Sequence, residues 1–210
     1  MKYKHIIWDW NGTLLDDAWL CVEIINQQLT AQNLPAISEQ VYADVFRFPV
    51  KDYYSVAGFD FNKVPFETLS DRFIEQYEVR KFECPLRAEG IASIKKINQA
   101  GIPQSVISAS IQSSLHQIVK HYGLFDQFIS VRGLDNHHAY GKLDIGREWM
   151  KELDLPAEQL LMVGDTLHDH QLAQDLGIDS VLIYSGHQSM ERLQKSQVPI
   201  LNSLDELFAL

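Results

Sequence analysis

Two hydrophobic patterns alternate along this chain. Short uninterrupted apolar runs, such as Ile6-Ile7-Trp8, are typical of strands buried on both faces of a parallel sheet. These runs predict strands at residues 4–9, 104–108, 127–131, 160–163 and 180–184. Between them, apolar residues recur every three or four positions, which predicts helices. The helical segments are Ile91–Ile97, Leu115–Tyr122, Leu143–Leu153 and His168–Leu176, with shorter patterns near 188–195 and 203–209.

This alternation of strands and helices indicates an α/β fold. Strands that alternate with helices form a parallel sheet with helices on both faces, so we expect a Rossmann-like, doubly wound parallel sheet. In such sheets ligands bind at the carboxyl ends of the strands. Polar residues that follow the predicted strands are therefore the first candidates for a functional site.

Residues 16–83 interrupt the alternation, because their pattern is helical throughout. Apolar residues such as Ile25 and Leu29 recur there at helical spacing, and no convincing strand separates them. This segment predicts a small all-helical unit inserted after the first strand. The core domain is then expected to comprise residues 1–15 and 84–210.

Composition narrows the class of protein. The 210 residues suit one core domain with a smaller insertion, and 46% hydrophobic residues exclude a mainly disordered chain. A net charge of −10 argues against nucleic acid as a partner. We find no apolar run of membrane-spanning or signal-peptide length, so we expect a cytoplasmic protein with no membrane partner. Cys21 and Cys84 lack the spacing of a metal site and fit a reducing compartment.

Chemically distinctive side chains follow four separate predicted strands. Asp9 ends the first, Ser108 ends the second, Lys142 lies beyond the third, and Asp165 and Asp169 follow the fourth. Three carboxylates without histidine or cysteine partners form a hard oxygen site that suits Mg²⁺. A lysine and a serine can bind a phosphoryl group, and a carboxylate can attack phosphorus as a nucleophile. The set therefore predicts phosphoryl chemistry at one crevice.

Four segments in this order and spacing resemble the motifs of the haloacid dehalogenase superfamily, most closely its phosphoglycolate-phosphatase-like branch. They are Asp9-Trp10-Asn11-Gly12-Thr13, Ser108, Lys142 and the Gly164-Asp165 to Asp169 segment, and together they span the whole chain. The helical insertion at 16–83 occupies the place where that family often carries a specificity cap. The resemblance implies an Mg²⁺-dependent phosphomonoesterase that acts on a small phosphorylated metabolite.

The resemblance also implies a role for each matching residue. Asp9 would be the nucleophile, which forms an aspartyl phosphate, and also a metal ligand. The other implied metal ligands are the backbone carbonyl of Asn11, Asp165 and Asp169. Ser108, Ala109 and Lys142 would hold the phosphoryl group, and Lys142 would also assist catalysis.

Asn11 departs from the family pattern. Phosphatases of this family usually carry an aspartate there, two residues after the nucleophile, as the general acid and base. An amide can orient a water molecule or a leaving group, but it cannot transfer a proton at neutral pH. General acid–base catalysis typically contributes about 10²–10⁴-fold to a rate. We therefore expect a slow or specialised phosphatase that uses an acidic leaving group or another acid.

Other polar residues are candidates on weaker grounds. Arg47 or Lys51 in the insertion could bind an anionic substrate when a cap closes, although both also fit solvated surface charges. His187 follows the strand predicted at 180–184, so its loop opens toward the same crevice and could contact substrate. His168 could line the pocket. His137-His138 more plausibly have structural or solvent-facing roles.

Three other functions remain open at this point. A phosphomutase would return the phosphoryl group to a sugar, and a dehalogenase would displace halide from carbon without needing the metal site. Asn11 could instead mark a non-catalytic relative that binds a phosphorylated ligand. Neither the substrate nor the oligomeric state can be deduced from the sequence.

Overall fold

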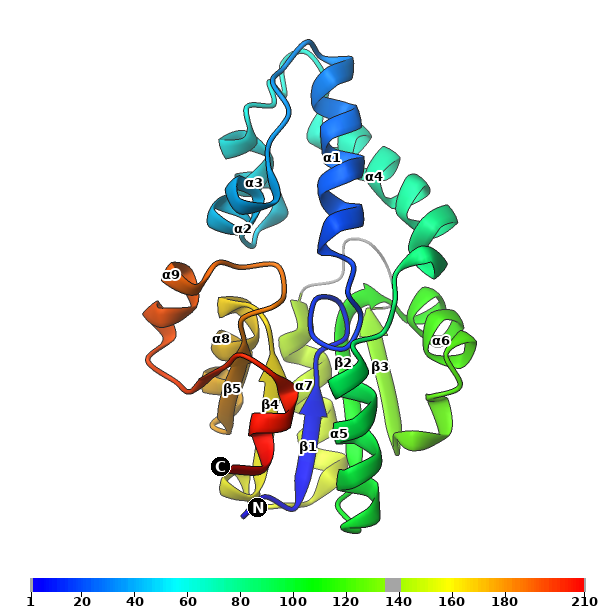
Figure 1. Cartoon of the computed structure of the whole chain (residues 1–210), viewed down its shortest axis with the longest axis vertical. Coiled ribbons are helices and arrows are strands. Elements are labelled where there is room, and N and C mark those ends of the chain that lie inside the picture. Colours follow the sequence, from blue (N-terminus) through cyan, green and yellow to red (C-terminus); the bar gives the residue numbers. More distant parts are fainter. Residues whose placement is uncertain (1, 135–140, 210) are drawn as a thin grey trace.

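A single parallel sheet forms the centre of the computed structural model, which describes residues 2–134 and 141–209. Within this described part, six strands lie in the order β3-β2-β1-β4-β5-β6, and all neighbouring pairs are parallel (Figure 1). The strands are β1 His5–Trp8, β2 Gln104–Ile111, β3 Ser130–Leu134, β4 Leu160–Gly164, β5 Asp179–Ile183 and β6 Ile200–Leu201. The strand order reverses direction at β1, which places β1 at the middle of the sheet.

Helices cover both faces of the sheet. The helices are α1 Ala18–Ala31, α2 Glu39–Val45, α3 Val50–Ala57, α4 Phe66–Arg80, α5 Ala88–Gln99, α6 Gln112–His121, α7 Gly141–Leu153, α8 Leu167–Leu176 and α9 Met190–Leu193. Apolar residues of α5, α6 and a C-terminal 3₁₀ helix at Leu204–Ala209 share one core cluster with the sheet. Residues of α7 and α8 share a second cluster with the opposite face. The predicted doubly wound α/β fold is thus confirmed.

β1 shows why its apolar run is uninterrupted. All four of its residues are buried. Ile6 and Trp8 belong to the cluster with α5 and α6, whereas Ile7 belongs to the cluster with α7 and α8. Successive side chains of a strand point to opposite faces, so a strand that is covered on both faces requires apolar residues at every position.

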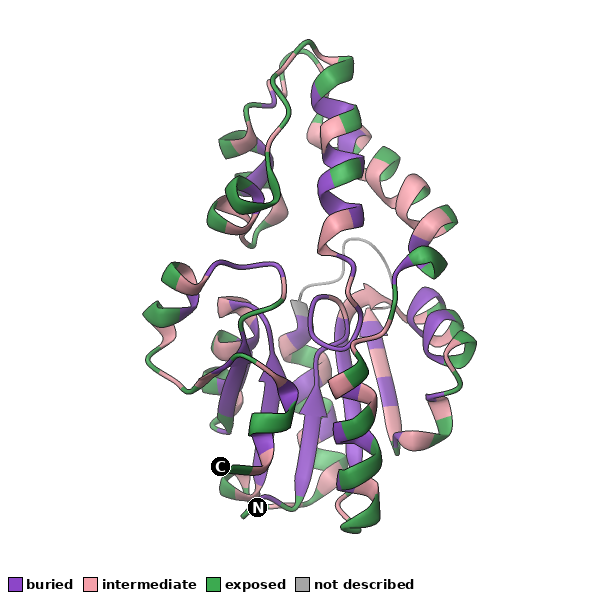
Figure 2. Cartoon of the chain, viewed as in Figure 1, coloured by how far each residue is buried: buried purple, intermediate pink, exposed green. Residues whose placement is uncertain are grey.

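The four helices α1–α4 stand apart from the sheet, at the carboxyl ends of its strands (Figure 1). They have an apolar cluster of their own, in which Ile25 of α1, Tyr42 of α2, Tyr53 of α3 and Leu69 of α4 are buried. Figure 2 shows that α1 carries buried residues along its length, while α2 and α3 expose much of their outer surface. No helix in the described ranges is both long and apolar enough to cross a membrane.

The observed elements differ from the predicted ones at several places. The strand predicted at 127–131 begins at Ser130, because Phe125–Gln127 forms a 3₁₀ turn. Helix α3 was not predicted, and the pattern near 203–209 forms a 3₁₀ helix. The two-residue strand β6 was also missed, so the 179–183 strand is not the last parallel strand of the sheet. A two-residue strand is too short to show a hydrophobic period.

Candidate active site

A cavity of about 420 Å³ lies between the carboxyl ends of the strands and helices α1–α4. Its core side is formed by residues from the loop after β1, from β2, α7 and α8, from the β4–α8 turn and from the loop after β5. Nearly all the residues predicted for the site line it: Asp9, Asn11, Ser108, Ala109, Lys142, Asp165, Asp169 and His187. The carboxyl ends of parallel strands meet at one edge of the sheet, which explains how residues so far apart in sequence converge.

Asp9 and Lys142 form the centre of the core side. Both side chains are buried, and the Lys142 ammonium donates hydrogen bonds to a carboxylate oxygen of Asp9 and to Asp169 (Nζ–Oδ1 2.7 Å). The other Asp9 oxygen accepts a hydrogen bond from the Thr13 hydroxyl at 3.2 Å. The Asp9 backbone N–H donates to the Val163 carbonyl and so continues the pairing of β1 with β4. These bonds orient the Asp9 carboxylate into the cavity.

Three buried carboxylates meet beside this lysine. Asp9, Asp165 and Asp169 each offer an oxygen atom within 4.8 Å of the other two. Asp169 lies in the first turn of α8, where one of its oxygens accepts hydrogen bonds from the backbone and the hydroxyl of Thr166, at 3.1 and 2.7 Å. Asp165 accepts from the Thr13 hydroxyl at 3.1 Å. The three carboxylates are therefore positioned by the fold itself.

The electrostatics of this cluster indicate a need for positive charge. Burial raises the pKa of Asp9 to about 8, although the ammonium of Lys142 acts in the opposite direction. Burial likewise raises the pKa of Asp165 to about 6. For Asp169 burial is outweighed by Lys142, so its pKa lies below the ordinary value. A divalent cation would relieve the repulsion among these groups, and an all-oxygen donor set fits Mg²⁺.

Asn11 is held by hydrogen bonds on both sides of its amide. Its Nδ2 donates to the Asp17 carboxylate and to the Tyr77 hydroxyl, both at 2.7 Å. Its Oδ1 accepts from the Ser110 hydroxyl at 2.7 Å and from Ser108 at 3.4 Å. The Tyr77 hydroxyl itself donates to Asp17 at 2.6 Å. Asn11 thus links β2 of the core to α4 of the insertion.

Asp17 is also the anion that faces His187. The distance from Asp17 Oδ1 to His187 Nε2 is 3.3 Å, and the other ring nitrogen of His187 lies 2.8 Å from the Tyr42 hydroxyl. Burial by itself would lower the pKa of His187, but Asp17 raises it to about 9. The backbone N–H of His187 donates to Asp165 at 2.6 Å. His187 therefore reaches both the insertion and the carboxylate cluster.

Asp17 and Tyr77 were missed by sequence reasoning. In the sequence, Asp17 is indistinguishable from an acidic residue that precedes a helix, and Tyr77 is one apolar position of a helical stripe. Their roles follow from contacts between residues 60 positions apart. No local pattern carries that information.

Of the weaker candidates that the structure describes, only His187 lines the cavity, whereas Arg47, Lys51 and His168 do not. The Arg47 guanidinium donates to the Val45 carbonyl at 3.0 Å, and Arg47 does not line the cavity. The His168 ring stacks on Phe48, with ring centres 4.5 Å apart. His137 and His138 lie outside the described residues. Cys21 and Cys84 are both free and buried.

Comparison with known proteins agrees with this geometry. The family model of the haloacid dehalogenase-like hydrolases matches residues 6–183. The chain belongs to this family. Asp9, Lys142, Asp165 and Asp169 all lie within the matched segment and line the cavity, and their individual roles stay predictions.

Relatives with assigned activities include a phosphatase and a kinase. A phosphoglycolate phosphatase from Pectobacterium atrosepticum is 27% identical over 94% of this chain and 87% of its own length. The tyrosine-protein kinase PtkA from Mycobacterium tuberculosis is 23% identical over 96% of this chain and 70% of its own length. The predicted enzyme class, a phosphatase of this family, agrees with the family match and the phosphatase relatives.

Solved structures share the fold over nearly the whole chain. A haloacid dehalogenase-like hydrolase from Streptococcus pneumoniae superposes with a TM-score of 0.83 at 17% identity, and the match covers 99% of this chain and 98% of the other. At this level of identity the likeness concerns the fold. The arrangement of the sheet and of its helices is therefore shared with that hydrolase.

Proposed function

We propose that this haloacid dehalogenase-like hydrolase is a phosphomonoesterase that cleaves a small phosphorylated metabolite through an aspartyl phosphate on Asp9. The observation that carries the proposal is the buried Asp9 carboxylate, which contacts the Lys142 ammonium and lies within 4.8 Å of Asp165 and Asp169. The phosphatase names of relatives support the same reaction class. We further propose that residues 16–83 form the cap that encloses the substrate.

The first step forms a bond between an Asp9 carboxylate oxygen and phosphorus, while the bond from phosphorus to the substrate alcohol breaks. The Lys142 ammonium neutralises negative charge on the transferring phosphoryl oxygens. The Ser108 hydroxyl, which lines the cavity at the end of β2, donates a hydrogen bond to the same group. The alcohol leaves toward the helical side of the cavity.

The second step is hydrolysis of the aspartyl phosphate. A water oxygen bonds to phosphorus, the bond from phosphorus to Asp9 breaks, and inorganic phosphate leaves with the carboxylate regenerated. Asn11 lies beside this reaction but cannot accept the proton of water or supply one to the alcohol. Its amide instead orients the reacting groups. Substrates with acidic alcohols should therefore react faster than those with basic alcohols.

Magnesium fits the donor set of this site. The carboxylates of Asp9, Asp165 and Asp169 and the backbone carbonyl of Asn11 would hold the ion, since hard cations prefer oxygen ligands. When bound, the ion supplies positive charge that stabilises the phosphoryl oxygens in the transition state. The protein's own contribution is to hold these ligands in buried, hydrogen-bonded positions.

Phosphoryl transfer to an acceptor other than water is the second candidate function. It is favoured by Asn11, which lacks the acid–base group that would activate water, and by the relative that is named a tyrosine-protein kinase. In this case Asp9 would still accept the phosphoryl group, and an alcohol would replace water in the second step. A non-catalytic role would require that neither step occurs.

The test is phosphate release from a panel of phosphorylated metabolites, measured with Mg²⁺ and with EDTA. We expect release by the wild type with Mg²⁺, and loss of at least about 10³-fold with EDTA or in Asp9→Asn. Asp126→Asn, an exposed aspartate on the far 3₁₀ turn, is the matched control and should retain wild-type rates.

Three results would decide between the candidates. Equal background release by the wild type and Asp9→Asn on the whole panel contradicts both catalytic proposals. Transfer to added glycerol or a sugar in preference to water favours transferase chemistry. Release that Asp9→Asn abolishes supports the phosphomonoesterase.

A further inference from the structure

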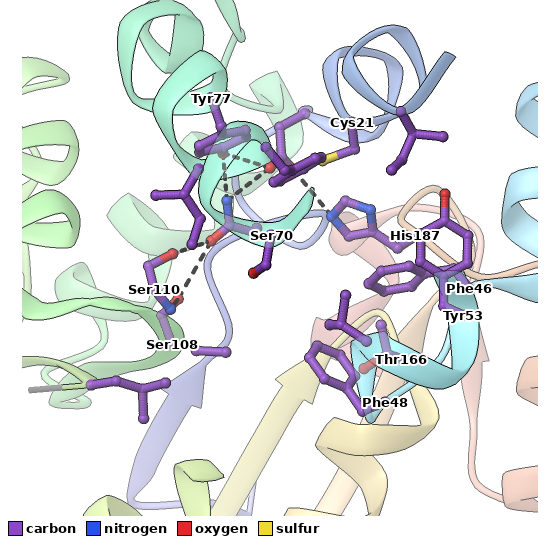
Figure 3. Close-up of a pocket in the computed structure, with 18 of the residues that line it drawn as sticks. Cys21, Phe46, Phe48, Tyr53, Ser70, Tyr77, Ser108, Ser110, Thr166 and His187 are labelled. Atoms are coloured by element: carbon purple, nitrogen blue, oxygen red, sulfur yellow. Dashed lines mark hydrogen bonds and ion pairs between the residues drawn. The ribbon is translucent and has the colours of Figure 1, made fainter. Parts of the chain in front are cut away.

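The helical side of the cavity is aromatic. Phe46, Tyr53, Tyr54, Phe66 and Phe73 line it from the loop after α2, from α3 and from α4. Figure 3 shows Phe46, Phe48 and Tyr53 on one side of the cavity, with Tyr77 and Ser70 on the opposite side. These residues surround the space that the substrate alcohol would occupy, which we call the leaving-group compartment. An aromatic wall stabilises an apolar group that it removes from water.

Positive charge in the cavity is confined to its core side and is already paired. Among the described residues that line the cavity, Lys142 is the only lysine or arginine. Its ammonium is bound by Asp9 and Asp169. His187 is the other potential cation, and it faces the Asp17 carboxylate at 3.3 Å. Neither group is free to balance an anion on the substrate alcohol.

Negative charge lines the leaving-group compartment instead. Glu67 and Asp71 lie one turn apart on α4, and both line the cavity with exposed side chains. Neither carboxylate forms an ion pair with any residue in the described ranges. By contrast Glu78, further along α4, is paired with Lys81 at 2.6 Å. A substrate alcohol that carries a further anionic group would meet two carboxylates whose charge no cation balances.

The two cationic residues of the insertion that the sequence offered as substrate contacts are directed elsewhere, and Arg72, which follows Asp71, does not line the cavity either. Arg47 bonds the Val45 carbonyl and does not line the cavity. The Lys51 ammonium lies 5.7 Å from the ring centres of Phe61 and Phe66, outside the lining. Both were candidates to hold an anionic substrate, and the structure places neither of them there.

We infer that the substrate is a phosphate monoester whose alcohol is bulky, apolar and either neutral or cationic, without a carboxylate or a second phosphate. This inference rests on the proposed phosphomonoesterase function. The phosphoryl group would be held at Lys142, while the alcohol packs among the aromatic rings near Glu67 and Asp71. An anionic substituent at that place would meet aromatic rings and two carboxylates without a free cation, which disfavours its binding relative to a neutral or cationic substituent.

The decisive experiment compares three probes of nearly identical shape. They are benzyl phosphate, its 4-carboxy derivative and its 4-aminomethyl derivative, with acetyl phosphate as a small substrate that does not fill the compartment. We expect kcat/KM for the neutral and cationic probes to exceed that of the carboxylate probe by about tenfold or more.

Variants of α4 test the origin of this preference. In the double variant Glu67→Gln/Asp71→Asn, we expect the discrimination against the carboxylate probe to fall by about threefold or more, because two repelling charges are removed. Glu75→Gln is the matched control. It lies exposed on the same helix but does not line the cavity, so it should leave the discrimination unchanged.

The outcomes distinguish failure of this inference from failure of the proposed phosphomonoesterase function. Preference for the neutral and cationic probes, reduced by the double variant only, supports it. A carboxylate probe that reacts as fast as benzyl phosphate overturns it while the phosphatase stands. Acetyl phosphate hydrolysis without reaction of any benzyl probe also overturns it. Absence of all hydrolysis, acetyl phosphate included, overturns both.

Discussion

The side-chain amide of Asn11 donates a hydrogen bond to the Asp17 carboxylate, with 2.7 Å between Nδ2 and Oδ2. Asp17 is buried and also receives bonds from Tyr77 and from the backbone N–H of Gly12, at 2.6 and 2.8 Å. A carboxylate at position 11 would face this acceptor without a proton to share at neutral pH. The amide at position 11 and the carboxylate at position 17 thus complement each other.

Replacing Asn11 by aspartate should therefore harm stability. The new carboxylate would repel the buried Asp17 carboxylate, and one hydrogen bond is lost, so Asn11→Asp should lower the free energy of unfolding by about 1–3 kcal/mol at pH 7. Adding Asp17→Asn should restore only part of it, because the hydrogen bond is re-formed with donor and acceptor exchanged while the negative charge that faces His187 is lost. Denaturant unfolding of the wild type, both single variants and the double variant measures the coupling.

The same double variant tests whether position 11 limits the rate. It places a carboxyl group where related phosphatases carry their general acid, so kcat for substrates with basic alcohols should rise by about 10²-fold. An unchanged kcat in a folded double variant would show that proton transfer at position 11 does not limit turnover.

Tyr77 should matter through its hydroxyl. The hydroxyl joins α4 to Asp17 and Asn11, so Tyr77→Phe should cost about 1–2 kcal/mol of unfolding free energy. Tyr53→Phe is the control, because the Tyr53 hydroxyl is buried and has no hydrogen-bond partner among the described residues. Its loss should be neutral or slightly stabilising. Thermal or denaturant unfolding that ranks the two variants the other way would contradict this assignment.

Gly12 should tolerate no side chain. Its φ of +77° is a left-handed conformation, and a Cβ atom there would overlap the Asp165 carboxylate. Gly123 also has a positive φ, +67°, but a Cβ there would meet nothing within 4 Å. Gly123→Ala should therefore cost about 1 kcal/mol of stability and leave activity unchanged. Gly12→Ala should cost more stability and lower phosphate release by about tenfold or more.

His5 should make stability depend on pH. It is buried, with Nε2 at 2.8 Å from the Ser105 hydroxyl, and burial lowers its pKa to about 4 from an unfolded value of 6.5. Between these values the unfolded chain binds more protons, so this contribution to stability is present above pH 6.5 and is lost as the pH falls toward 4. The full contribution is up to about 3 kcal/mol.

The measurement is the free energy of unfolding at pH 7 and pH 4.5. We expect His5→Gln to lose less stability than the wild type over this interval, since glutamine can bond Ser105 without gaining a proton. His121→Gln, an exposed position at the end of α6, serves as the control and should follow the wild type. Parallel pH curves for His5→Gln and the wild type would contradict the assignment.

Much of the fold could be predicted because its signals are local. The run Ile6-Ile7-Trp8 identifies a strand covered on both faces, and the helical spacing before Gly101 identifies α5. The failures have physical causes too. The strand at 130–134 was placed too early, because Phe128 and Ile129, which lie between a 3₁₀ turn and the strand, extend its apolar pattern.

The residues of the candidate site also fall into those whose position could be predicted from local signals and those whose position could not. Asp9 and Asp165 follow strands and Ser108 lies in the carboxyl-terminal half of β2, and a parallel sheet brings the carboxyl ends of its strands to one edge, so their convergence could be deduced. Arg47 shows the limit of such reasoning. Its position in a charged and aromatic segment suggested a substrate contact, but the direction of its side chain depends on how α2 and α3 pack, and it bonds Val45 instead.

The sequence by itself determined the order of the motifs, the doubly wound core and the meeting of three carboxylates with one lysine. Hydrophobic period and strand ends are properties of short segments, so they can be recognised without knowing the packing. Only the tertiary structure decided that Asn11 is held between Asp17, Tyr77 and Ser110, and that the helical side of the cavity is aromatic and acidic. Those relationships depend on how α4 packs against α1 beyond the carboxyl ends of the strands, which joins residues distant in sequence through side-chain geometry.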